Sequence, residues 1–106
     1  MKEEKKGFST RAIHSDSISH KWPGNPVVTG ISLSTTFKQE AAGKPDKYEY
    51  SRSGNPTRDA LENTLAELEN AKYALTYASG LAAEANILHL LEPGDEVICC
   101  DDVYGG

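Results

Sequence analysis

A short segment around Gly80 has the composition of a phosphate-binding turn. Residues 78–83 read ASGLAA, with the glycine between an apolar strand candidate and a helix candidate. A glycine at such a junction lets a phosphate approach backbone N–H groups at the positive end of the helix dipole. Gly80 and Leu81 would donate through their main chains, with Ser79 nearby. The alternative is a Ser-Gly turn that serves chain geometry alone.

A second candidate lies in residues 48–56, which read YEYSRSGNP. The guanidinium of Arg52 has the planar fork that suits a phosphate, and Tyr50 adds a hydroxyl donor two residues away. The alternative is a surface loop that contains an ordinary arginine.

The third candidate is the segment 101–106, which reads DDVYGG and follows another apolar strand candidate. Ligands bind at the carboxyl ends of strands in open α/β sheets, and the ring of Tyr104 could stack there on a flat heterocycle. The neighbouring carboxylates of Asp101 and Asp102 lack a third ligand, so we expect no metal site.

The elements that would carry these segments are regular only in the second half of the chain. Residues 1–50 contain three prolines with glycines among them, so no long helical periodicity survives there. A short helical turn is expected at 9–14, and short extended pieces are expected at 27–28 and 31–34. We therefore expect residues 1–50 to form an irregular arm that packs on another part of the protein.

A helix is predicted to follow this arm. Asn55 can cap it, and Pro56 suits its first position. Leucines at 61, 65 and 68 recur at helical spacing, and Asn70 is a suitable end. A strand at 73–77, a helix at 81–91 and a strand at 96–100 are predicted next.

Strand, helix and strand in this order form a βαβ unit with parallel strands and a right-handed crossover. Residues 79–81 and 101–106 would then lie at the carboxyl ends of neighbouring strands, an arrangement that fits a flat phosphorylated cofactor. Parallel sheets are covered by helices on both faces, which two helices cannot supply. We therefore expect an α/β fold in which residues 51–106 are the incomplete start of a larger domain.

The composition excludes several classes of function. Sixteen acidic and eleven basic residues among 106 give a net charge of -5, opposite to the basic patch of a nucleic-acid-binding module. No apolar run approaches the roughly 18 residues of a membrane-spanning helix. The charged N-terminus lacks the apolar stretch of a secretory signal, so a cytoplasmic location is expected. The adjacent Cys99 and Cys100 are expected to be buried, reduced thiols.

Taken together, the segments resemble the N-terminal signatures of the Cys/Met-metabolism family of pyridoxal-phosphate enzymes. The similarity spans nearly the whole chain and is carried by 31–39 (ISLSTTFKQ), 50–57 (YSRSGNPT), 78–83 and 101–106. It implies the fold type I of PLP-dependent transferases, with residues 1–50 as arm and 51–106 as the first βαβ part of the cofactor domain. Among members of the family, carbon–sulfur gamma-lyases resemble this chain most, although gamma-synthases, beta-lyases and methionine gamma-lyases share much of the pattern.

The resemblance implies pyridoxal 5'-phosphate as the cofactor and gives roles to the residues near the strand ends. Gly80 and Leu81, beside Ser79, would hold the cofactor phosphate through backbone N–H groups. Tyr104 would stack on the pyridine ring.

The resemblance also implies partners. Members of the family build each active site across a dimer, usually within a dimer of dimers, so Tyr50 and Arg52 would reach the phosphate in a neighbouring subunit. The irregular arm would embrace that subunit. Glu49 matches a position associated with the choice of a sulfur amino acid substrate.

No lysine of this chain falls in the family's Schiff-base motif, so residues 1–106 are expected to hold no catalytic nucleophile and to be inactive alone. Two alternatives from other classes remain open. One is a non-catalytic interaction chain whose arm embraces a full-length subunit. The other is a small phosphate-binding module.

Overall fold

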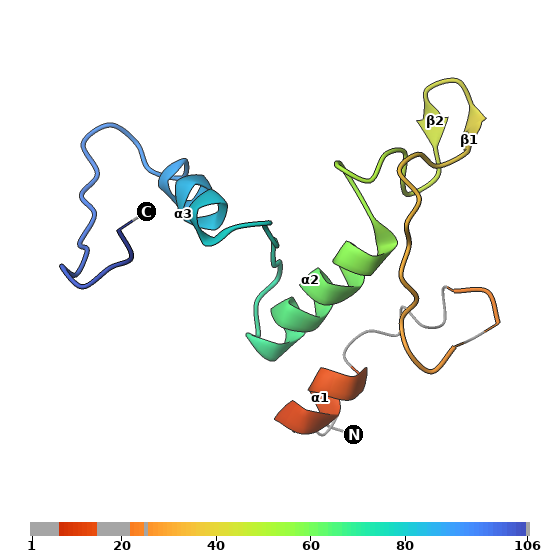
Figure 1. The fold of residues 1–106 in the computed structure, drawn as a ribbon, viewed down its shortest axis with the longest axis horizontal. Helices are drawn as coiled ribbons and strands as arrows, with labels where there is room; N and C mark the ends of the chain where they lie inside the picture. Colours follow the sequence, from red (N-terminus) through yellow and green to blue (C-terminus); the bar gives the residue numbers. More distant parts are fainter. Residues whose placement is uncertain (1–6, 15–21, 25, 106) are drawn as a thin grey trace, which may run out of the picture. The chain divides into compact units, whose positions relative to one another are not determined.

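The structure is a computed structural model that describes residues 7–14, 22–24 and 26–105. The chain divides into two compact units, Met1–Leu75 and Thr76–Gly106. Figure 1 shows the order of the elements, which is α1 (Phe8–His14), β1 (Gln39–Ala41), β2 (Lys44–Pro45), α2 (Pro56–Leu68) and α3 (Gly80–Leu88). None of the helices in the described ranges is long and apolar enough to cross a membrane.

Helix α2 begins where the sequence predicts. The Oδ1 atom of Asn55 accepts from the backbone N–H groups of Thr57 and Arg58 at 2.8 and 3.1 Å. Pro56 occupies the first helical position, where its missing N–H costs nothing. Both local signals, the cap and the proline, are therefore confirmed.

Helix α2 ends at Leu68, and Asn70 leaves the helix in the left-handed region at φ 55°. Asparagine is one of the few residues besides glycine that adopts this conformation readily. Helix α1 packs at the same end, where Arg11 donates to the carbonyl of Glu67 and, at 3.0 Å, to Oδ1 of Asn70. The predicted helical turn at 9–14 is thus confirmed as α1.

Small residues fill the packed side of α2. Among the described residues, Ala60 and Ala66 are the buried apolar ones, whereas Leu61 and Leu65 are 51% and 37% exposed. The leucine spacing predicted the helix correctly, but the leucines do not form a buried stripe within this unit.

The arm is held against the first turn of α2 by hydrogen bonds. The Thr57 hydroxyl accepts from the backbone N–H of Ser32 at 2.8 Å and donates to the carbonyl of Gly30 at 3.0 Å. Asn55 adds a bond from Nδ2 to the carbonyl of Ser32 at 3.3 Å. Neither 27–28 nor 31–34, which were expected to be extended, forms a strand. Side chains at the start of α2, rather than a strand partner, bond to the backbone of Gly30 and Ser32.

The arm also contains a hairpin that the sequence analysis missed. Strands β1 and β2 pair antiparallel, and Gly43 between them has φ +69°. An isolated antiparallel bridge joins Thr36 to Tyr50 below the hairpin. The sequence did not predict this hairpin, because its short strands lack an alternation of apolar and polar residues and β2 ends on a proline.

In the second unit, helix α3 begins at the predicted junction. The Oγ atom of Ser79 accepts from the backbone N–H of Ala82 at 3.2 Å and caps the helix. The helix ends at Leu88, three residues before the predicted end at Leu91. Tighter turns follow it, with Leu90 N–H to Ile87 O at 3.0 Å and Leu91 N–H to Leu88 O at 3.1 Å.

The two predicted strands of the βαβ unit are not formed. Residues 73–77 and 96–100 carry no strand pairing in the described part of the chain, and Ile98 is fully exposed. A strand needs a neighbouring strand to satisfy its backbone, and none pairs with these segments. The same lack of cover leaves Cys99 and Cys100 exposed, so the expectation of buried thiols was wrong, although both are free.

Candidate functional site

A tight turn presents Tyr50 and Arg52. The carbonyl of Tyr50 accepts from Ser53 N–H at 3.1 Å, from Gly54 N–H at 2.9 Å and from the Ser53 hydroxyl at 2.9 Å. The guanidinium carbon of Arg52 lies 5.1 Å from the centre of the Tyr50 ring. Stacking of this kind restrains the arginine without using its N–H donors. The two residues predicted to bind phosphate are therefore side by side, and both are exposed.

The bridge between Thr36 and Tyr50 fixes the segment that enters this turn. The N–H of Phe37 donates to the carbonyl of Glu49 at 2.9 Å, and the N–H of Ser51 donates to the carbonyl of Thr35 at 2.8 Å. The side chain of Glu49, directly before Tyr50, is exposed.

Arg58, in the first turn of α2, is a residue that the sequence analysis missed. Its Nη1 and Nη2 atoms donate to the carbonyls of Ser51 at 2.9 Å and Arg52 at 3.5 Å. A signal was present, because a cation in the first turn of a helix opposes the helix dipole. Such a residue needs a partner outside the helix, and here the partners are backbone carbonyls.

The second predicted phosphate site is the start of α3. Ser79 caps the helix, and the first N–H groups of any helix, here those of Gly80 and Leu81, have no partner within it. A Cβ atom built on Gly80 meets nothing within 4 Å, so the approach to this turn is open. The side chain of Leu81 is 61% exposed.

Tyr104 lies in the same unit as this turn, in the irregular chain after Asp101. Its ring is 95% exposed. No group of three His, Cys, Asp or Glu residues in the described ranges is placed to hold a metal ion. Ser79, Gly80, Leu81 and Tyr104 thus belong to the second unit, and Glu49, Tyr50 and Arg52 belong to the first.

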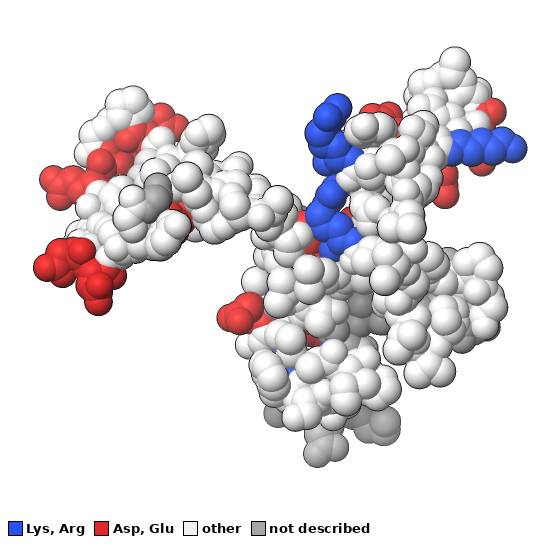
Figure 2. All heavy atoms as spheres, in the orientation of Figure 1, with Lys and Arg blue, Asp and Glu red and all other residues white. Residues whose placement is uncertain are grey.

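Charge is distributed unevenly between the two units. All eleven lysines and arginines lie at or before residue 72, whereas residues 76–106 contain six acidic residues and no basic one. Figure 2 shows acidic side chains along the part of the chain that carries α3, and basic side chains over the segment that leads into α2. Residues 76–106 therefore offer an anion at the start of α3 backbone N–H groups but no lysine or arginine.

A polar cluster joins the hairpin to α2. The Oδ2 atom of Asp59 lies 2.5 Å from Nζ of Lys47 and accepts from the Tyr48 hydroxyl at 2.8 Å. Burial raises the pKa of Asp59, but the hydrogen bonds from Lys47 and Tyr48 outweigh it and hold that pKa below 3.8. The same bond to Asp59 raises the pKa of Lys47, and burial raises the pKa of Tyr48.

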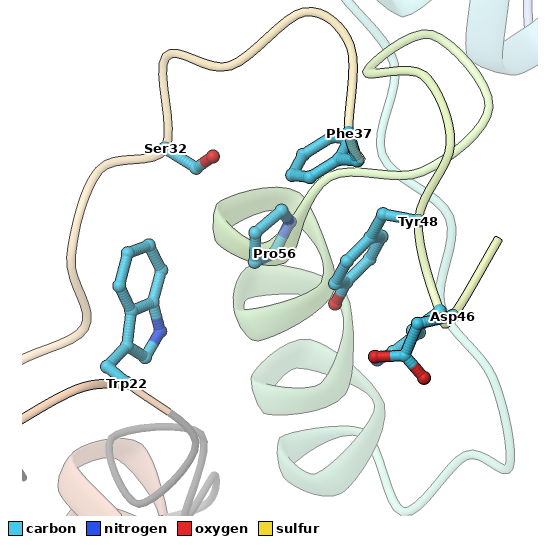
Figure 3. Close-up of a pocket in the computed structure, with 7 residues that line it drawn as sticks. Trp22, Ser32, Phe37, Asp46, Tyr48 and Pro56 are labelled. Atoms are coloured by element: carbon cyan, nitrogen blue, oxygen red, sulfur yellow. The ribbon is translucent and has the colours of Figure 1, made fainter. Parts of the chain in front are cut away.

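A hollow of about 410 Å³ lies beside this cluster (Figure 3). The rings of Trp22, Phe37 and Tyr48 surround it with Pro56, and Phe37 and Tyr48 are 5.4 Å apart at their ring centres. None of the predicted site residues lines it. Its remaining lining residues are Ser32, Asp46 and Lys47.

Comparisons with known proteins identify the family of the chain. The profile of the family described as Cys/Met metabolism PLP-dependent enzyme matches residues 9–106. Human cystathionine gamma-lyase is 58% identical over 99 residues, which are 93% of this chain and 24% of that protein. The chain thus spans about a quarter of the length of the curated relatives it matches.

The similar solved structures include cystathionine lyases and synthases. Yeast cystathionine gamma-lyase is 46% identical with a TM-score of 0.75, over 87% of this chain and 23% of that one. A cystathionine gamma synthase from Xanthomonas oryzae is 34% identical with a TM-score of 0.75, over 87% of this chain and 24% of that one. The predicted fold class is confirmed by these neighbours, although the strands of the βαβ unit are unpaired here.

Proposed function

Because this chain belongs to the Cys/Met metabolism PLP-dependent enzyme family, we propose that it is the N-terminal part of a cystathionine gamma-lyase. The reaction would cleave cystathionine to cysteine, 2-oxobutanoate and ammonia. Pyridoxal phosphate is the cofactor of the family, and it serves as an electron sink when bound. The observation that carries the proposal is the turn at 50–54, where the exposed guanidinium of Arg52 lies 5.1 Å from the centre of the Tyr50 ring.

The donor set of the chain fits a phosphorylated ring. Arg52 offers a fork of N–H donors with a permanent charge, and Tyr50 offers a hydroxyl. Gly80 and Leu81 offer backbone N–H groups at a capped and unobstructed helix start. Tyr104 offers a ring that is free to stack, as its 95% exposure indicates.

In this proposal each residue binds or orients, and none performs the chemical step. Ser79, Gly80 and Leu81 hold the phosphate, and Tyr104 stacks on the pyridine ring. Tyr50 and Arg52 reach the same phosphate from a second copy within a dimer of dimers. The arm at 1–50 contacts that copy, and residues 51–106 begin the cofactor domain.

Glu49 would contribute to the choice of substrate rather than to cofactor binding. It comes directly before Tyr50, and its side chain is exposed. A carboxylate so close to the cofactor contacts would interact with the ammonium group of a sulfur amino acid.

The lysine that family members need for their Schiff base would come from outside residues 1–106. Lys47 is engaged by Asp59 at 2.5 Å, and Lys72 lies 5.0 Å from the centre of the Tyr73 ring. We therefore expect a 106-residue polypeptide to bind cofactor weakly and to turn over no substrate.

Two measurements on the intact protein that carries these residues test the proposal. The apoprotein is titrated with pyridoxal phosphate, followed by cofactor absorbance, and 2-oxobutanoate is measured after addition of cystathionine. Arg52→Ala should weaken cofactor binding by roughly 10- to 100-fold, because charge-assisted hydrogen bonds contribute about 1.5–3 kcal/mol. Arg11→Ala, an arginine held at the other end of α2, is the matched control.

Equal cofactor affinity of Arg52→Ala, Arg11→Ala and the wild type would contradict the proposed site. A product other than 2-oxobutanoate would assign a different reaction. A gamma-synthase or a methionine gamma-lyase is the alternative within the family, and the Xanthomonas synthase shares the fold of this chain at a TM-score of 0.75.

A second candidate function is a non-catalytic chain that associates with full-length subunits. Exposed apolar side chains in the second unit favour it, among them Leu81, Ile87 and Ile98 at 61%, 62% and 100% exposure. Size-exclusion chromatography of the 106-residue polypeptide with an intact homologue tests this candidate. Comigration supports it, and separate elution contradicts it.

A further inference from the structure

Arg58 holds the outer part of the turn that carries Tyr50 and Arg52. Its Nη1 atom donates to the carbonyl of Ser51 at 2.9 Å, and its Nη2 atom donates to the carbonyl of Arg52 at 3.5 Å. Its Nε atom lies 3.9 Å from Oε1 of Glu62 one helical turn further along α2. The side chain is one-third exposed, so it is partly shielded from water.

The turn's own hydrogen bonds do not reach these two carbonyls. They run from Ser53 and Gly54 to the carbonyl of Tyr50, and so they close the turn at its base. Ser51 and Arg52 are the central residues of the turn, and their carbonyls take no part in the closing bonds. Arg58 supplies the contact that the turn itself lacks.

We infer that Arg58 is a positioning residue that keeps Tyr50 and Arg52 aligned for the phosphate of the cofactor. The inference rests on the proposed function and adds to it a residue that touches neither cofactor nor substrate. A planar fork can hold two carbonyls at once, which an ammonium on a flexible stem cannot do. Asn55 caps the same turn of α2 and accepts from the N–H of Arg58, so the backbone that carries the Arg58 side chain is held in place.

The expected effect follows from the population of the aligned turn. If removal of the fork reduces the aligned fraction to about one-tenth, the apparent affinity for the cofactor falls about tenfold. Arg58→Ala should show this loss, and Arg58→Lys should show a smaller loss in the same direction. Glu62→Gln removes the acidic neighbour of Arg58 but leaves both carbonyl contacts, so its cofactor affinity should equal that of the wild type.

The test uses the intact protein in its apo form, with pyridoxal phosphate as the probe in an absorbance titration. Hydrogen exchange of residues 50–54 is followed by mass spectrometry on the same four proteins. Exchange at Ser53 and Gly54 should accelerate in Arg58→Ala and stay unchanged in Glu62→Gln. A residue that only stabilises the fold would lower the melting temperature without this local change.

The outcomes separate the inference from the proposed function. Wild-type protein that binds no pyridoxal phosphate refutes the proposed function, and the inference falls with it. Weakened binding in Arg52→Ala combined with wild-type binding in Arg58→Ala refutes the inference alone. If Arg58→Ala does not fold, Arg58→Lys decides, and wild-type affinity in that variant overturns the role of the fork.

Discussion

Thr57 offers a sharp test of how the arm is attached to α2. Its hydroxyl accepts from the N–H of Ser32 at 2.8 Å and donates to the carbonyl of Gly30 at 3.0 Å. Thr57→Val removes both hydrogen bonds and keeps the β-branched shape of the side chain. Thr57→Ser is the matched control, because it keeps the hydroxyl and loses only a methyl group.

The size of the effect can be worked from these two contacts. Each hydrogen bond contributes about 0.5–1.5 kcal/mol net, so the local loss is about 1–3 kcal/mol. Since 1.4 kcal/mol corresponds to a factor of ten, the opening equilibrium of the arm segment should rise about 5- to 150-fold. The N–H of Ser32 loses its acceptor in Thr57→Val, so its hydrogen-exchange rate should show the full rise in the opening equilibrium.

The assay is hydrogen exchange of residues 30–34 in the intact protein, compared among wild type, Thr57→Val and Thr57→Ser. We expect faster exchange at Ser32 in the valine variant and near-wild-type exchange in the serine variant. Equal protection of Ser32 in all three proteins would refute the reasoning, because it would mean that the Thr57 hydroxyl does not hold the arm.

Two further predictions concern the side of the first unit around the hollow. Asp59→Asn should lower the melting temperature at pH 7, because Lys47 and Tyr48 lose a charged acceptor. The pKa of Asp59 lies below 3.8, so this stabilisation is present above that pH and is lost as the pH falls through the folded value. The gap between the two melting temperatures should therefore narrow as the pH falls below the ordinary Asp range near 4, and a gap that stays constant down to acid unfolding would contradict the assignment. Gly30→Ala would place a Cβ atom 2.7 Å from Cζ3 of Trp22, so the ring must move. Trp22 is the single tryptophan, and its fluorescence emission should shift in this variant but not in Gly7→Ala, where a Cβ meets nothing within 4 Å.

The parts of the fold that the sequence predicted are those with local causes. Helix α2 could be predicted because its start and end depend on nearby residues. These are the cap Asn55, the first-turn Pro56 and Asn70, which follows the helix. The start of α3 was predicted within one residue, from the Ser79-Gly80 junction, and the structure adds that Ser79 caps the helix. Strands depend on partners distant in sequence, which is why 73–77 and 96–100 were predicted but did not pair.

The candidate site was predictable to a similar extent. Tyr50 and Arg52 are two residues apart in a turn rich in Ser and Gly, so their proximity follows from local sequence. Arg58 was missed because its carbonyl contacts depend on how the turn folds back over the helix start. A first-turn arginine against the helix dipole was the available clue.

In the proposed function, the charge distribution favours a cation from outside residues 76–106 at the cofactor phosphate. Residues 76–106 carry six carboxylates and no lysine or arginine, so this segment provides no such cation beside the N–H groups of Gly80 and Leu81. A helix start contributes about half an elementary charge, which is too little to balance a phosphate near pH 7. A guanidinium supplies a full positive charge, and the exposed Arg52 is the one that the proposed function assigns to the phosphate. We therefore expect the cofactor affinity of Arg52→Ala to depend less on salt than that of the wild type, because screening weakens the attraction between ions. An unchanged salt dependence in that variant would mean that the compensating cation is another residue.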